Sequence, residues 1–139
     1  MRRRTSERLK RLAPDIKREV GSVLFSAGEL LATAAQVSIT SGSASGTSGG
    51  RHQHVPSRPG EPPHNFTGVL ANNIEVTQPE QLLVQVTSHA PYSKHLEYGT
   101  SRMAARPFMG PAAQATKRDI KKLVAKATSR AFRRSRGRA

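Results

Sequence analysis

The chain has 139 residues, of which 35% are hydrophobic and 4% aromatic, so its length predicts one domain with a small aliphatic core. It has no cysteine, which excludes disulfides and thiolate metal sites and favours a reducing compartment. The formal charge of +14 predicts an acidic partner, either nucleic acid or the acidic face of another protein. The alternative explanation is solubility combined with frayed basic ends.

The basic residues are concentrated at the two ends of the chain. Eight Lys and Arg lie within the first eighteen residues, and ten lie between Lys117 and Arg138. We expect no stretch with the roughly 18 apolar residues of a membrane span. Because no apolar region follows Met1 to Arg4, we also expect no signal peptide.

A long first helix is predicted over residues 5–37, beginning near Thr5 or Ser6. Its apolar residues recur at intervals of three and four, which gives one continuous stripe. Pro14 lies inside this pattern and should kink or divide the helix near Ala13. Gly21 and Gly28 would be tolerated where another backbone packs closely. The stripe consists of Leu9, Leu12, Ile16, Val20, Val23, Leu24, Ala27, Leu30, Leu31 and Ala34.

A flexible loop or arm is predicted over residues 41–66, because the sequence SGSASGTSGG and the prolines after it leave nothing to bury. Such a loop inside a compact domain is usually either functional or disordered. An arm that reaches a neighbouring subunit and a disordered loop are equally compatible with this composition.

Short helices and a sheet are predicted over residues 67–109. Thr67 can cap a single helical turn that ends at Asn72. Residues 74–77 and 82–87 alternate as two strands around a turn at Gln78 to Gln81, with Pro79 in the turn. Leu82, Val84 and Val86 should share a face with the apolar residues of the first strand. Because two strands alone are marginal, residues 106–109 are the candidate third strand.

The segment from Ala90 to Ala113 is predicted to join the sheet to the last helix. A short helical turn begins after Tyr92 and ends at Gly99, and Pro111 lies where a proline can open a helix. The last helix should cover residues 110–132, with a disordered basic tail at 133–139. The fold class is therefore α+β, with a long N-terminal helix, three or four antiparallel strands and a C-terminal helix packed on the sheet.

The pattern argues against catalysis and against metal binding. No pair of carboxylates is spaced to act together, no nucleophile motif is present, and no phosphate-binding glycine pattern occurs. His52, His54 and His64 lie in flexible surroundings without acidic partners, which favours solvent-exposed side chains over metal ligands. We therefore expect no enzyme, no metal and no cofactor.

Two motifs carry a resemblance to a known family. Downstream are Glu97-Tyr98-Gly99-Thr100, then Pro107-Phe108 and Pro111-Ala112; upstream are Pro59-Gly60-Glu61-Pro62-Pro63, Thr67-Gly68-x-Leu70 and Ile74. In this order and separation they resemble tailed-phage tail-completion proteins, also called head–tail joining or neck proteins. The Ser/Gly-rich insert and the unusually basic ends depart from the family pattern.

The resemblance implies a structural protein of the virion neck, assembled in the bacterial host cytoplasm. Copies would form a ring, most often a hexamer, and would dock onto the head connector, adaptor or stopper protein and the tail terminator or tail tube. Non-specific contact with packaged DNA is a further expectation, and a membrane partner is not. Two alternatives stay open: a free-standing nucleic-acid-binding protein and a portal-side adaptor.

Interface candidates follow from the motifs and from the charge. They are Thr67, Gly68, Leu70, Tyr92, Glu97, Tyr98, Gly99, Thr100, Pro107, Phe108 and Pro111, with Arg133, Arg134, Arg136 and Arg138 as contacts of the basic tail. Glu97 is expected to pair with Arg102, with Arg106 or with a neighbouring subunit, unless it is simply a surface carboxylate. Phe108 fits the core and Tyr98 an interface. Against nucleic-acid binding, no aromatic stacking platform is expected among the basic residues.

Overall fold

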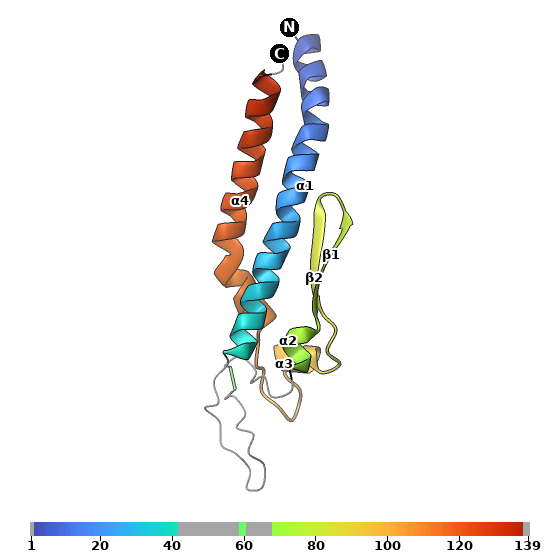
Figure 1. The fold of residues 1–139 in the computed structure, drawn as a ribbon. Helices are drawn as coiled ribbons and strands as arrows, with labels where there is room; N and C mark the ends of the chain where they lie inside the picture. Colours follow the sequence, from blue (N-terminus) through green and yellow to red (C-terminus); the bar gives the residue numbers. More distant parts are fainter. Residues whose placement is uncertain (1, 42–58, 61–67, 138–139) are drawn as a thin grey trace. The chain divides into compact units, whose positions relative to one another are not determined.

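The computed structural model describes residues 2–41, 59–60 and 68–137 (Figure 1). Within these residues, four helices and two strands follow one another in the order α1 (Arg2–Thr40), α2 (Val69–Asn72), β1 (Ile74–Glu80), β2 (Leu83–Ser88), α3 (Ser93–Tyr98) and α4 (Met109–Gly137). The α+β class is confirmed. The predicted loop at 41–66 lies almost wholly outside the described residues.

The chain divides into two compact units. Unit 1 comprises Met1–Glu29, Val76–Gln85 and Lys117–Ala139, and unit 2 comprises Leu30–Glu75 and Val86–Thr116. Each contains part of α1, part of the β1–β2 hairpin and part of α4. We describe each unit by itself.

In unit 1, α1 is the element that both α4 and the hairpin contact. Arg134 of α4 forms an ion pair with Glu19 of α1. Gln78 of the hairpin donates a hydrogen bond from Nε2 to the carbonyl oxygen of Gly21, at 2.9 Å. Here α4 therefore packs on α1, where the sequence had suggested packing across the sheet.

Gly21 shows why α1 has a glycine in its interior. A Cβ atom at this position would lie 2.6 Å from the carbonyl oxygen of Gln81, far inside normal contact distance. The hairpin turn can approach the helix only because position 21 lacks a side chain. The predicted close approach of a second backbone is confirmed at Gly21.

Unit 2 contains a small hydrophobic core. Ile39 of α1 and Phe108 are the two largest fully buried side chains, and the core also contains Leu70, Ala71 and Ala90. Gln36 donates a hydrogen bond from Nε2 to the carbonyl oxygen of Ala71, at 3.2 Å, which ties α1 to the α2 turn.

The sheet has two strands among the described residues, where three or four were expected. The candidate third strand at 106–109 is not a strand. The backbone N–H of Arg106 donates to the carbonyl oxygen of Leu96 at 2.6 Å, and Met109 already begins α4. The chain there connects α3 to α4 instead of pairing with the hairpin.

The hairpin is longer and its turn tighter than predicted. Pro79 lies within β1, and the turn consists of Gln81 and Leu82. Proline is tolerated because a two-stranded sheet has only edge strands. Val84 and Val86 are half-buried, like Ile74 and Val76 of β1, whereas Leu82, which was expected to share their face, is 49% exposed in the turn.

Both long helices exceed their predicted bounds. Pro14 does not divide α1, which runs for 39 residues. The predicted disordered tail is wrong up to Gly137, because α4 continues to that residue. Arginine is a good helix former, and basic side chains in the last turn favour the helix dipole, so the absence of an apolar period does not end this helix.

One further expectation was too strong. Judged by mean hydropathy over 18 residues, α1 is long and apolar enough to cross a membrane, with 28% of that window buried in the fold. Core helices of soluble proteins and signal sequences meet the same criterion. The two criteria differ because the expectation concerned an unbroken apolar stretch, whereas the mean hydropathy tolerates Glu29 and several small polar residues.

Candidate interaction surfaces

The Glu97 carboxylate caps the beginning of α4. Its Oε2 accepts hydrogen bonds from the backbone N–H groups of Phe108 (2.9 Å) and Met109 (3.0 Å), and its Oε1 accepts one from Gly110 (2.9 Å). The first N–H groups of a helix have no partner within the helix and carry partial positive charge. Glu97 therefore satisfies three of them and also complements the helix dipole.

The expected pairing of Glu97 with Arg102 or Arg106 is not found among the described residues. The alternative of a purely surface carboxylate is wrong as well, since the group is half-buried and holds three donors. Sequence reasoning considered charged partners and overlooked the backbone N–H groups. Arg106 instead has a buried Nε without a hydrogen-bond partner in this part of the structure.

Gly110 makes room for the Glu97 carboxylate. A Cβ atom at position 110 would lie 3.0 Å from Oε1 of Glu97, closer than ordinary van der Waals contact. Sequence reasoning missed this glycine. The signal that could have found it is a glycine in the first turn of a helix, where alanine is normally preferred.

Gly99 ends α3, as predicted. Its φ of 74° favours glycine, and its N–H donates to the carbonyl oxygen of His95 at 2.8 Å. A Cβ atom there would lie 2.9 Å from both the backbone nitrogen of Ala105 and the carbonyl oxygen of Met103. Glycine is therefore required twice, by the backbone conformation and by the returning chain.

Thr100 closes the turn that follows. Its N–H donates to the carbonyl oxygen of Met103 at 2.8 Å, and its Oγ1 accepts from the N–H groups of Arg102 (3.3 Å) and Met103 (3.1 Å). The four-residue motif thus contains a helix cap, a glycine turn and a hydroxyl turn. The side chain of Tyr98, the fourth member of the motif, takes part in none of these contacts.

Tyr98 projects into solvent. Its side chain is 78% exposed, the largest fraction among the exposed large hydrophobic residues of the described chain. Tyr92 is 42% exposed. Phe108 is 1% exposed, which confirms its core position. Pro107 is half-buried in the connection, and Pro111 lies in the first turn of α4, where it was expected.

The upstream motif is only partly described. Leu70 is buried in the unit 2 core, and Gly68, with φ 75°, precedes α2 as its N-cap residue without a side-chain cap. Thr67, the predicted cap, lies outside the described residues. The single helical turn itself is confirmed.

Unit 2 exposes several large apolar side chains around its small core. They lie on α1, α2 and α3 and in the segment before α3: Leu30, Val37, Val69, Tyr92 and Tyr98. Single exposed apolar residues are normal, and of these five Tyr98 and Val37 are the most exposed, at 78% and 55%.

Unit 1 carries nearly all of the charge. Eighteen of the 23 Lys and Arg residues but six of the nine Asp and Glu residues fall within its bounds, so its formal charge is +12 and that of unit 2 is +2. The motif residues, in contrast, belong to unit 2. Charge and motifs are thus separated in the fold as they are in the sequence.

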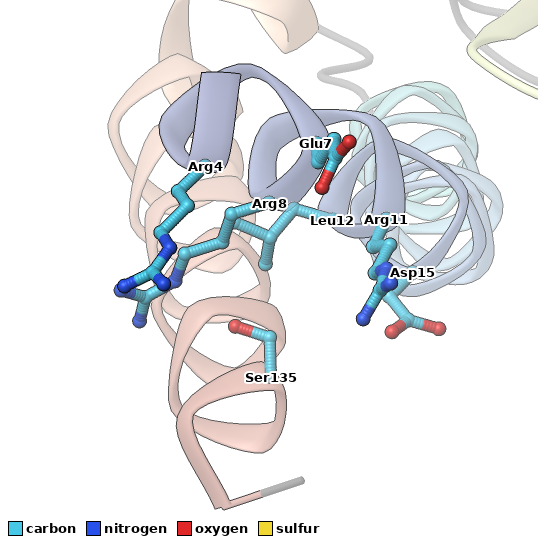
Figure 2. A pocket seen from close by; sticks show the side chains of 7 residues that line it. All are labelled: Arg4, Glu7, Arg8, Arg11, Leu12, Asp15 and Ser135. Atoms are coloured by element: carbon cyan, nitrogen blue, oxygen red, sulfur yellow. The ribbon is translucent and has the colours of Figure 1, made fainter. Parts of the chain in front are cut away.

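A cleft of about 460 Å³ lies in unit 1 beside the start of α1 and the end of α4. It is lined by Arg4, Glu7, Arg8, Arg11, Leu12, Asp15 and Ser135 (Figure 2). Arg4 and Arg8 are one helical turn apart and extend to the same side, whereas Asp15 is held by Arg18 at 2.5 Å. The three arginines of this lining can attract an anion.

The four arginines predicted as tail contacts differ in their roles. Arg134 is engaged by Glu19, Arg133 and Arg136 are exposed, and Arg138 lies outside the described residues. Phe132, 45% exposed, lies among them and is a single aromatic side chain beside the basic residues. No group of three His, Asp or Glu residues that could hold a metal occurs in the described ranges.

Comparison with protein-family models, with curated proteins and with solved structures finds no match. The family resemblance therefore depends on the quoted motif residues alone.

Proposed function

We propose that the protein is a structural component of a tailed-phage neck and forms a ring that joins the tail to the head connector. The observation that carries the proposal is the structure of the downstream motif. Glu97, Gly99 and Thr100 build a rigid junction between α3 and α4, and the same junction presents Tyr98 to solvent. Three residues of the motif hold the junction together, and the fourth is an exposed aromatic side chain. This arrangement is suited to an interface with another protein.

A ring requires a heterologous interface, in which one surface of a copy meets a different surface of the next. Aromatic residues are enriched at such interfaces, and Tyr98 at the end of α3 supplies one anchor. Val37 and Val69, 55% and 39% exposed, are candidates for the same or the opposing surface. The head connector, adaptor or stopper and the tail terminator or tube would be the neighbours above and below.

The first test is the assembly of the purified protein. Native mass spectrometry and negative-stain electron microscopy should show a closed ring, with six copies as the expected number. Twelve copies would favour the portal-side adaptor, and a monomer at all concentrations would contradict the proposal. Labelling of virions should place the protein at the neck.

Tyr98→Ser is the variant that tests the interface. Because the side chain is 78% exposed, its removal should leave the melting temperature almost unchanged and weaken the ring. Phe132→Ser removes an exposed aromatic residue from unit 1 and is the matched control, with rings expected to persist. Intact rings from Tyr98→Ser would remove this residue from the interface.

A further inference from the structure

The outer side of α4 carries a row of basic side chains. Arg118, Lys122, Lys126 and Arg130 follow one another at intervals of four, and Arg133 and Arg136 continue the row. With 3.6 residues per turn, all six fall within an arc of about 120°. All six are exposed, whereas Ala127 and Ala131, on the opposite side, are buried. We call these six residues the basic face.

The basic face is almost free of neutralising groups. Of the described ion pairs, the only one made by α4 is that of Arg134, which lies outside the arc. Asp119 is the single acid within the arc, and it lies within 4 Å of no basic group in the described structure. The face therefore has a net formal charge of +5 in a unit of +12.

We propose that the basic face of α4 binds the sugar–phosphate backbone of nucleic acid without regard to sequence. From Arg118 to Arg136 the row extends about 27 Å at 1.5 Å per residue, with a charge about every 6 Å along its first four members. Nucleic acid is a regular polyanion, with about one charge per 1.7 Å of duplex axis. A long, evenly charged row matches such a ligand better than it matches a compact acidic patch on a protein.

The side chains of the basic face explain why the binding should not depend on the base sequence. The basic face contains Lys and Arg but no Asn or Gln, which read adenine edges in a groove. Phe132 lies beside the row and is exposed, so it could stack on an unpaired base. Duplex and single strand share the phosphate chemistry, and the experiment separates them.

The test is a fluorescence-anisotropy titration of the full chain with a 30-base-pair duplex and with a 30-nucleotide single strand, across a salt series. The triple variant Arg118→Gln/Lys122→Gln/Lys126→Gln should bind the duplex at least about 10-fold more weakly at low salt. The slope of log K (the binding constant) against log salt concentration should also become less steep. For three lost contacts the change is about 2.7 for the duplex and about 2.1 for the single strand. Phe132→Ala should weaken only the single strand.

The matched control removes three positive charges from elsewhere, as Lys10→Gln/Lys17→Gln/Lys94→Gln. It should weaken binding by no more than about 2-fold, because none of the three residues belongs to the basic face and they contribute only to the overall field of the protein. Asp119→Asn removes the one acid of the face and should strengthen binding. A folding defect would weaken binding, so a gain in affinity cannot be explained by misfolding.

Three results would overturn the proposal. They are no binding of either nucleic acid at low salt, equal losses in the two triple variants, and competition by polyglutamate as effective as competition by DNA. The last result would assign the face to an acidic protein. The proposal does not depend on the ring, since a protein without rings can bind DNA through α4 and a ring without DNA binding can still join a tail.

Discussion

Replacing Glu97 by alanine should destabilise the protein by about 2 kcal/mol. Two of its hydrogen bonds, to the N–H groups of Phe108 and Met109, are partly buried, whereas the one to Gly110 is exposed. Loss of a helix cap costs about 0.5–2 kcal/mol, and loss of charge at a helix N-terminus costs about 0.3–1 kcal/mol. Water can replace the exposed hydrogen bond to Gly110, but it can replace the two partly buried hydrogen bonds only incompletely.

Urea denaturation followed by circular dichroism measures this loss, and thermal melting should show a decrease of roughly 6–10 °C. Glu97→Gln should cost about 1 kcal/mol, because its carbonyl can still accept two of the N–H groups while the charge is lost. Glu80→Ala, an exposed acid at the end of β1, is the matched control and should change stability little. Equal effects of Glu97→Ala and Glu80→Ala would refute the capping role.

Gly110→Ala tests the same contact between Glu97 and the beginning of α4 from the other side. The added Cβ would press on Oε1 of Glu97, which offsets the gain of up to about 1 kcal/mol that alanine brings to a helix. In the wild-type chain the substitution should be nearly neutral, and in the Glu97→Ala chain it should stabilise. A double-mutant cycle with no coupling between the two positions would show that they do not interact.

Three other substitutions, with Gly60→Ala as the control for the first, test the packing of the scaffold. Gly99→Ala should cost at least about 3 kcal/mol, combining about 1–3 kcal/mol of strain at its φ of 74° and ψ of 177° with backbone overlap. Gly60→Ala, with φ 84° and open space around it, has positive φ without the overlap and should cost less. Gly21→Ala should destabilise despite its better helix propensity, because the Cβ overlaps the hairpin turn; a stabilised protein would show that the turn is not seated on α1. Phe108→Ala should cost about 3–5 kcal/mol in urea denaturation, as expected for a fully buried aromatic residue, and a loss below about 1 kcal/mol would contradict its place in the core.

Elements encoded by local patterns were predictable from the sequence. In α4 the buried residues Ala127 and Ala131 are four positions apart, as the helical period requires, and Gly99 marks the end of α3 as its conformation requires. These features depend on residues a few positions apart, so periodicity and turn chemistry suffice. The hairpin followed from the same reasoning, although Pro79 belongs to its first strand.

Features that depend on distant partners were not predictable. Glu97 meets N–H groups eleven to thirteen residues away, and a sequence shows its charge without showing where a helix will expose its first donors. The candidate third strand failed for a related reason. Phe108 packs into the core of unit 2 from a connecting segment, so the hairpin gains burial from this core and not from a third strand.

The two proposals become linked if the ring forms, because several basic faces would then contact one nucleic-acid molecule. Multivalent binding can raise apparent affinity by 10²–10⁴ without any new contact. Tyr98→Ser, which should leave single copies, is therefore expected to bind a 30-base-pair duplex at least about 10-fold more weakly than the wild-type ring. Asp119→Asn should still strengthen binding in that background, because each copy keeps its own face. Equal affinity of ring and single copies would mean that the basic faces do not act together on one duplex, and would assign DNA binding to the individual chain.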